Sequence, residues 1–189
     1  MDSRPSSDSH YSLFTIHCPL TCFNVCMAVA TYDDVVHEIR ALASRTASAK
    51  EFMRAIVVRL AQIPNFNWVG FYMIEPGQAG EPEKMLVLGP FVGADTPHKR
   101  IPLNQGICGA AASRGETVVV EDVHSDPRYL ACSIETQSEI VAPIRAHGEI
   151  VGELDIDSHT PAAFQPAERA LVEHCAEVVG NFLERTFER

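Results

Sequence analysis

The hydrophobic periodicity of this chain changes twice along its length, and the order of the changes limits the folds open to it. Apolar residues recur at helical spacing over residues 32–46 and 48–60, and the same period returns over 166–185. Between these segments the pattern is that of strands joined by short insertions. Because strands and helices do not alternate, a doubly wound parallel sheet is disfavoured. The order predicts one α+β domain, with a central antiparallel sheet packed on one side against N- and C-terminal helices.

The strand region also contains a short helical segment. Predicted strands cover residues 66–75, 84–90, 117–121, 137–145 and 149–157. A short helix is expected over 107–114, whereas 125–132 is polar and irregular. The closing helix carries Pro166 in its first turn, where proline is favoured.

Composition and charge restrict the class of partner. Of the 189 residues, 46% are hydrophobic and 21% charged, so wholesale disorder is excluded. Lysine and arginine number 15 against 25 aspartates and glutamates, and the net charge of −10 argues against nucleic acid or an anionic membrane as main partner. No apolar run reaches the roughly 18 residues of a membrane-spanning helix. Six cysteines scattered over a chain of this size are typical of reduced thiols, so we expect a cytoplasmic protein.

Residues 1–30 differ in character from the remainder. We expect either a disordered extension or a native translation start nearer Met27, so that residues 31–189 form the single domain. The apolar stretch matches a secretory signal poorly, because Pro19 and polar residues interrupt it. Three cysteines spaced by four would share a helix face and could hold a metal: Cys18, Cys22 and Cys26. With the proline present and no obvious fourth ligand, adventitious cysteines are the favoured interpretation.

The last predicted hairpin gathers acidic residues. In the strand over 149–157, three acids share one face: Glu153, Asp155 and Asp157. A two-residue loop would pair Glu139 of the preceding strand with Ile156, whereas a three-residue loop over 146–148 would pair it with Asp155. We favour the three-residue loop, because its last residue is a glycine that accepts a left-handed conformation.

Like charges directly opposite one another destabilise a sheet, so this cluster needs a reason. One interpretation is a site for a cation, either a ligand ammonium or a metal. Another is a carboxyl group with a raised pKa that can donate a proton. The alternative of equal weight is a solvated outer face of the sheet.

Two cysteines in the middle of the chain are candidates for redox chemistry. Cys108 lies at the glycine-rich start of the short helix, where a helix N-terminus can lower the pKa of a thiol. Cys132 lies in the irregular segment, four residues after Arg128, which would supply positive potential if that segment were helical. Neither has the spacing of a metal motif, and two buried structural thiols are the alternative.

The first predicted strand carries the only tryptophan. Trp68, Gly70 and Tyr72 alternate onto one face of it. This face either packs in the core or forms an apolar box around a small ligand, with Gly70 leaving space between the two rings.

Several short motifs occur together over residues 32–183. They are Asn67-Trp-Val-Gly-Phe-Tyr72, Leu88-Gly-Pro-Phe-Val-Gly93, Arg100-Ile-Pro102 with Gly106-Ile-Cys-Gly109, Cys132 followed by Ser138-Glu-Ile-Val141, and Gly152-Glu-Leu-Asp-Ile-Asp157. In these motifs the chain resembles the GAF-domain free methionine-(R)-sulfoxide reductases, which act on the free amino acid. The resemblance implies a GAF-like fold, reduction of free L-methionine-(R)-S-oxide to L-methionine, and a homodimer.

By this resemblance Cys132 matches the catalytic cysteine and Cys108 a resolving cysteine. The implied reaction leaves Cys132 as a sulfenic acid, which Cys108 condenses to a disulfide that thioredoxin reduces. No metal or organic cofactor is implied. Many members carry a further cysteine ten residues before the Cys108 position, where this chain has His98. That difference bears on which disulfide forms.

The resemblance also assigns the substrate pocket. Glu139, Asp155 and Asp157 match the acids that hold the substrate, while Trp68 and Tyr72 match its aromatic wall. Reduction of a sulfoxide requires protonation of its oxygen, and the implied proton donor is Glu139 or Asp157.

Two other functions fit the same fold. One is a non-catalytic GAF module that binds a small ligand, and the other is a redox sensor in which Cys108 and Cys132 form a switch without substrate turnover. A module would retain its ligand without turnover, whereas a sensor would form its disulfide without reducing a sulfoxide.

Overall fold

The computed structural model describes residues 31–131 and 133–187. Residues 1–30, with Cys18, Cys22 and Cys26, lie outside this range, and so does Cys132. The expectations about the extension, the domain boundary and the three early cysteines therefore stay predictions.

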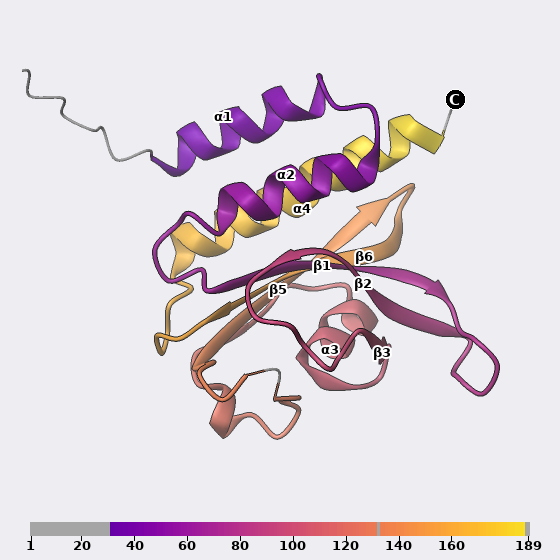
Figure 1. Cartoon of the computed structure of the whole chain (residues 1–189), viewed down its shortest axis with the longest axis vertical. Helices are drawn as coiled ribbons and strands as arrows, with labels where there is room; N and C mark the ends of the chain where they lie inside the picture. The colour runs from indigo at the N-terminus through magenta and orange to yellow at the C-terminus, as the bar shows by residue number, and fades with distance from the viewer. Residues whose placement is uncertain (1–30, 132, 188–189) are drawn as a thin grey trace, which may run out of the picture.

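Three long helices form one layer of the molecule (Figure 1). They are α1 (Tyr32–Ala43), α2 (Ala49–Leu60) and α4 (Pro166–Phe187). Thr31 begins α1 in a capping box, because its hydroxyl accepts the Asp34 N–H at 3.3 Å and the Asp34 carboxylate accepts the Thr31 N–H at 2.8 Å. Ser48 begins α2 by accepting the N–H of Glu51 at 3.2 Å. Over the described part of the chain, no helix combines the length and apolarity needed to cross a membrane.

The second layer is a six-stranded antiparallel sheet in the order β3-β2-β1-β6-β5-β4. The strands are β1 (Trp68–Pro76), β2 (Lys84–Val92), β3 (Arg100–Pro102), β4 (Val118–Val120), β5 (Ser138–Ala146) and β6 (Glu149–Ser158). The predicted α+β class, with an antiparallel sheet against the terminal helices, is confirmed. The short edge strand β3 was not predicted, because its pairing with β2 rather than any alternation of its own defines it.

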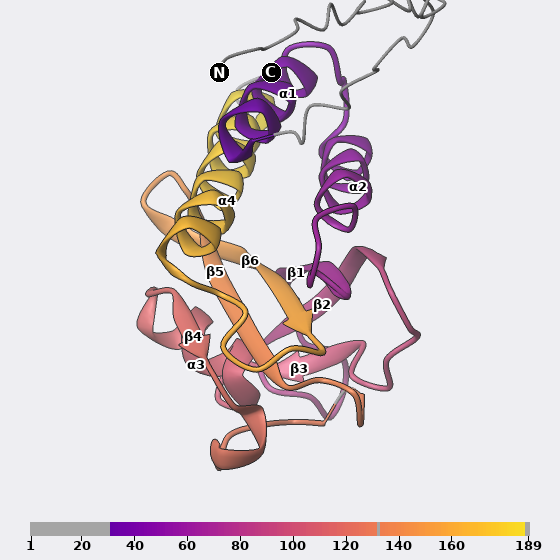
Figure 2. The same cartoon turned by 90° about the vertical axis from the view of Figure 1, so that its left-hand side faces the viewer.

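One helix lies on the opposite face of the sheet. The short helix α3 (Gly106–Arg114) packs against β5 and β6 on the side away from α1, α2 and α4 (Figure 2). The prediction that helices cover one side only is therefore incomplete. Gly109 lets α3 lie close to the segment that follows β3, since a Cβ at this position would lie 3.0 Å from the Leu103 backbone.

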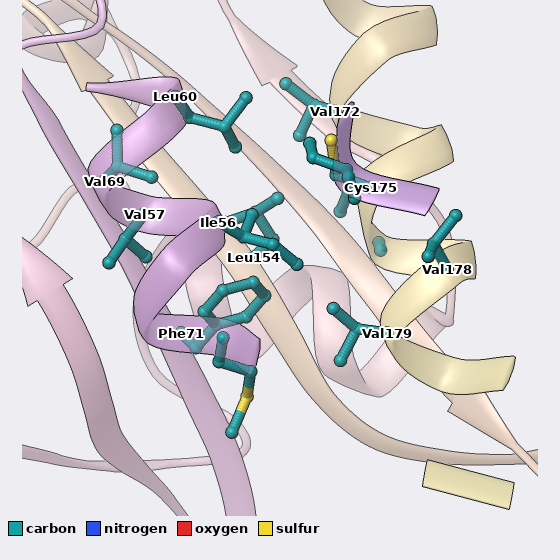
Figure 3. Packing of buried hydrophobic residues seen from close by; sticks show 14 of the residues in the cluster. Ile56, Val57, Leu60, Val69, Phe71, Leu154, Val172, Cys175, Val178 and Val179 are labelled. Carbon is teal, nitrogen blue, oxygen red and sulfur yellow. The ribbon is translucent and has the colours of Figure 1, made fainter. Parts of the chain in front are cut away.

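The main core fills the space between the long helices and the sheet (Figure 3). Helix α2 contributes Ile56 and Leu60, while β1 and β6 contribute Phe71 and Leu154, all fully buried. Cys175 of α4 lies in the same cluster, and burial raises the pKa of its thiol to about 12. Cys175 is therefore a structural thiol.

The hairpin of β5 and β6 differs in register from both predicted alternatives. His147 and Gly148 form a two-residue turn, with φ of 50° and 80°, and Ala146 pairs with Glu149. Two positive φ values are typical of a type I′ turn, which matches the twist of the strands. The favoured three-residue loop is thus wrong.

A register shift after this turn brings the acids back to one side. Ile144 pairs with Gly152 and Arg145 with Ile150, so β6 carries one extra residue at Val151. This bulge makes Glu139 pair with Asp157, instead of the predicted Asp155. The expectation that the acids share a face holds, but the turn and the bulge together produce it.

Candidate active site

The acidic residues of β6 lie on the face of the sheet that α3 covers. Their neighbours on this face are side chains of β1 on one side and of β5 on the other. Along β6, Asp157 pairs with Trp68 of β1 on one side and with Glu139 of β5 on the other. Asp155 similarly lies between Gly70 and Val141. Because residues directly opposite in a sheet share a face, acids, aromatic rings and α3 meet at one place.

Burial of the four carboxyl groups excludes the solvated outer face considered above. Glu139, Asp155 and Asp157 are 3–5% exposed, and Glu153 is completely buried. Within the described residues, neither Glu153 oxygen has a hydrogen-bond partner, and the same holds for Asp155 Oδ1. Unpartnered buried carboxyl oxygens are costly, which marks this cluster as a site with a function.

Burial and mutual repulsion raise the pKa of every acid in the cluster. Burial raises the pKa of Asp155 to about 7, despite the opposing effect of the Cys108 thiol. Burial and then the charge of Asp155 raise the pKa of Asp157 well above its usual value. Glu139 and Glu153 shift in the same direction, chiefly through burial. The cluster therefore holds protons near neutral pH and can donate them.

Cys108 is the thiol that α3 places against these acids. Its Sγ lies 3.5 Å from Asp155 Oδ2 and 4.0 Å from Glu139 Oε1. Burial and the charges of Asp155, Glu153 and Glu139 raise the pKa of Cys108 well above the usual thiol value. The predicted lowering by the helix N-terminus is therefore wrong, because burial next to carboxylates outweighs it.

The segment leading to Cys132 is irregular, as predicted, and Cys132 itself lies outside the described residues. Arg128 was expected to supply positive potential at Cys132 only if the segment were helical. Residues 126–131 are not helical, so this condition is not met. Arg128 instead pairs with Asp126, with Nε donating to Oδ1 at 2.9 Å. His98 lies beside this segment, with Nε2 3.3 Å from the Ala131 carbonyl oxygen.

The two rings of the predicted aromatic wall are held in place by hydrogen bonds to backbone carbonyl groups of the segment after β2. Trp68 and Tyr72 stack with ring centroids 6.3 Å apart. Trp68 Nε1 donates to the Ala94 carbonyl at 3.0 Å, and the Tyr72 hydroxyl donates to the His98 carbonyl at 2.8 Å. A Cβ at Gly70 would lie 2.2 Å from the Trp68 ring. The space above Gly70 therefore holds the tryptophan ring itself, and is not the open gap that was predicted.

A cavity of about 230 Å³ opens at the Trp68 and Asp157 end of the cluster. Its polar lining includes Asn67, Thr96, Ser133, Glu135, Thr136 and His159. These residues come from separate loops, so no spacing in the sequence identifies them. The cavity connects the predicted aromatic wall with one of the predicted acids.

Comparisons with known proteins identify the family of this chain. The GAF domain family model matches residues 48–183. The chain is 38% identical over 138 residues to protein YtsP of Bacillus subtilis, covering 73% of this chain and 81% of that protein. It is 35% identical over 128 residues to the free methionine-R-sulfoxide reductase of Escherichia coli, covering 67% of this chain and 73% of the relative. This chain belongs to the GAF-domain free methionine-R-sulfoxide reductase family.

A solved structure of the same reductase family supports the assignment. The free methionine-R-sulfoxide reductase of Neisseria meningitidis, determined in complex with its substrate, superposes with a TM-score of 0.76 at 30% identity. The match covers 83% of this chain and 90% of that protein. The predicted family and GAF-like fold are confirmed.

The structure adds two residues to the site predicted for this reductase-family chain. Phe91 of β2 stacks on Trp68 with centroids 5.7 Å apart, and only the pairing of β1 with β2 brings it there. Glu153 joins the buried acids beside Cys108. Its place on the acidic face was visible in the sequence, but its burial under α3 was not.

Proposed function

We propose that this chain reduces free L-methionine-(R)-sulfoxide to L-methionine. The observation that carries the proposal is the meeting of Trp68 and Tyr72, the buried acids and the Cys108 thiol on one face of the sheet. The family relatives from Escherichia coli and Neisseria meningitidis, named for this activity, support it.

The pocket suits a small zwitterion with an apolar end. A carboxylate among Glu139, Asp155 and Asp157 pairs with the α-ammonium, and the wall of Trp68 and Tyr72 packs on the methyl end. Free methionine sulfoxide has this ammonium, whereas a residue inside a peptide has a neutral amide at the same atom. The preference for the free amino acid follows from this difference.

The first chemical step transfers oxygen from sulfur to the enzyme. The Cys132 thiolate attacks the sulfoxide sulfur while Glu139 or Asp157 protonates the oxygen, because oxide is a very poor leaving group. The attack forms an S–S bond between Cys132 and the substrate sulfur. Transfer of the protonated oxygen to the Cys132 sulfur then breaks this S–S bond and the S–O bond, so methionine departs with two electrons gained and Cys132 is left as a sulfenic acid. The raised pKa values of both acids keep a proton available at neutral pH.

The second step regenerates the thiol. Cys108 attacks the sulfenic sulfur, an S–S bond forms, and hydroxide leaves as water after protonation. Asp155 is the nearest base for the Cys108 proton, with Oδ2 3.5 Å from Sγ and a pKa of about 7. A dithiol such as thioredoxin then reduces the disulfide and restores both cysteines. No metal or organic cofactor takes part in these steps.

The test is a thioredoxin-coupled assay that follows NADPH consumption. We expect turnover of free L-methionine-(R)-sulfoxide, and none of the (S) epimer or of a blocked, peptide-like sulfoxide. The Cys132→Ser variant should be inactive, whereas Cys175→Ala, which changes a thiol of the core, should keep activity.

Retention of sulfoxide without turnover, even with dithiothreitol, would favour a binding module. Peroxide-driven disulfide formation without sulfoxide reduction would favour a redox sensor.

A further inference from the structure

The buried cluster under α3 contains a thiol as well as carboxylates, and this combination has a use beyond the sulfoxide chemistry. Ligand atoms of Cys108, Glu139 and Asp155 all lie within 4.8 Å of one another, and all three residues are buried. A sulfur among oxygens is the donor set of a borderline divalent ion such as Zn²⁺, whereas Mg²⁺ and Ca²⁺ prefer oxygen alone.

The observed distances fit such an ion. A tetrahedral Zn²⁺ with about 2.3 Å to sulfur and about 2.1 Å to oxygen separates the two ligand atoms by about 3.6 Å. The Cys108 Sγ lies 3.5 Å from Asp155 Oδ2 and 4.0 Å from Glu139 Oε1. One separation already matches, and the other needs only a small movement of the Glu139 side chain.

Glu153 is an independent indication of a missing ligand. It is fully buried, and neither of its oxygens makes a hydrogen bond of standard geometry among the described residues, although the Cys108 thiol interacts with it. On β6 it is two residues before Asp155 and therefore on the same face. In its ionised form a carboxyl group in this position costs free energy, and either a proton or a bound cation removes that cost. Glu153 is not among the three residues whose ligand atoms lie within 4.8 Å of one another, so it would become the fourth ligand only after its side chain moves toward them.

We propose that Cys108, Glu139, Glu153 and Asp155 form a binding site for Zn²⁺ or a similar ion that blocks the reductase. Binding replaces the S–H bond of Cys108 by a metal–sulfur bond, and the proton goes to solvent. The bound thiolate then cannot attack a sulfenic acid, and the carboxylates cannot hold a substrate ammonium. The cavity lined by Asp157 lies next to the cluster, because Asp157 pairs with Glu139 in the sheet. The ion acts as an inhibitor and not as a cofactor. The blocking rests on the proposed sulfoxide reduction, whereas the binding does not.

The binding is tested with Co²⁺, whose thiolate charge-transfer band in the near ultraviolet reports a sulfur ligand directly. The titration uses the full chain carrying Cys18→Ser, Cys22→Ser and Cys26→Ser, so that the early cysteines do not contribute. We expect one equivalent of Co²⁺ to give the band and Zn²⁺ to displace it. Cys108→Ser should remove the band, and Cys175→Ala should leave it unchanged.

Glu153→Gln, which keeps the shape of the side chain, tests the fourth ligand. We expect the affinity for Co²⁺ to fall at least tenfold, about the lower end of what loss of a group supporting a metal site costs. Circular dichroism verifies that the Glu153→Gln variant is folded. If this variant does not fold, the Cys108→Ser titration alone tests the site. Absence of a stoichiometric band, or a band that survives Cys108→Ser, would overturn the site.

Turnover measurements separate this proposal from the proposed function. One equivalent of Zn²⁺ should stop sulfoxide reduction, and a chelator should restore it. A Co²⁺ band in a protein that is inactive when metal-free would support the site and contradict the reductase activity. Activity that persists at saturating Zn²⁺ would overturn the inhibition.

Discussion

At the residue scale, the chemistry depends on how far burial shifts the properties of ordinary side chains. Cys108 was expected to be a more acidic thiol because it begins a helix, yet carboxylates and desolvation make it less acidic. A thiol of this kind is a poor first nucleophile and a reasonable resolving group, because it needs a neighbouring base. Asp155 meets that need at 3.5 Å.

Replacement of Cys108, the proposed resolving thiol, should limit the proposed reaction to one cycle. In a chain that also carries Cys18→Ser, Cys22→Ser and Cys26→Ser, the Cys108→Ser variant should release about one methionine per chain with thioredoxin as reductant, because the Cys132 sulfenic acid then lacks its proposed partner. Dithiothreitol, which reduces a sulfenic acid directly, should restore repeated turnover. Rapid-quench product analysis measures both values, with Cys175→Ala as the control that keeps full activity. Undiminished thioredoxin-dependent turnover of Cys108→Ser would contradict the role.

The raised pKa of Asp155 also makes stability depend on pH. The folded chain holds this proton up to about pH 7, whereas the unfolded chain loses it near pH 3.8. The contribution of Asp155 to the free energy of unfolding is therefore fully present below pH 3.8, and it is lost as the pH rises through 7. Between pH 5 and pH 8 this group alone removes about 2 to 3 kcal/mol from the free energy of unfolding.

The Asp155→Asn variant should lose less stability than the original chain over that pH range. The remaining decrease comes from Glu139, Glu153 and Asp157, whose pKa values shift in the same direction. Urea unfolding at pH 5 and pH 8 gives the comparison, with the exposed Glu116→Gln as a control that changes nothing. Identical pH dependence for Asp155→Asn and the original chain would show that this carboxyl is ionised throughout.

At the scale of elements, the pairing of strands decides which residues meet. The alternation in 149–157 placed three acids on one face, but the partners of those acids followed from the turn at His147 and Gly148 and the bulge at Val151. A one-residue difference in register exchanges every pair across the hairpin. Residue types favour certain backbone conformations in a turn but do not fix them, so the loop length could not be read from the sequence. The strand partners of the acids were therefore not predictable.

The position of the tryptophan likewise depends on the backbone of its own strand. A methyl group at Gly70 would lie 2.2 Å from the Trp68 ring, so Gly70→Ala should displace the ring from the pocket. We expect KM for free methionine-(R)-sulfoxide to rise at least tenfold, with a cost in stability of about 1–3 kcal/mol from overpacking. Steady-state kinetics and urea unfolding measure the two effects.

Gly89→Ala in the neighbouring strand is the matched control. Its Cβ would lie 3.2 Å from the Phe71 carbonyl oxygen, which requires a shift of only a few tenths of an ångström. We expect KM to stay unchanged in this variant. An equal rise in both variants would show that the effect comes from the sheet as a whole and not from the ring.

At the scale of the whole molecule, the sheet separates a structural layer from a reactive one. The three long helices and the inner sheet face form the main core, whereas α3, the acids and the aromatic wall occupy the other face. Changes in the core should therefore alter stability without altering the site.

Phe52→Ala tests this separation. Phe52 is fully buried and its ring centroid lies 4.7 Å from that of Phe182, so its loss should cost about 3–5 kcal/mol. We expect the folded fraction of the variant to keep an unchanged KM for the sulfoxide. Urea unfolding and kinetics below the unfolding transition measure the two. A large rise in KM would mean that the two faces are mechanically linked.

The sequence alone determined the class of fold, the family and most of the residues that meet at the site. Helical and strand periodicities follow from which faces of each element are buried, and each motif lies within a short stretch of the chain, so both are visible in a linear pattern. Only the tertiary structure decided that α3 lies over the acids, that Glu139 pairs with Asp157, and that Glu153 is buried beside Cys108. These features depend on contacts between elements far apart in the chain. Burial at such contacts, rather than residue type, sets the direction of the pKa shifts.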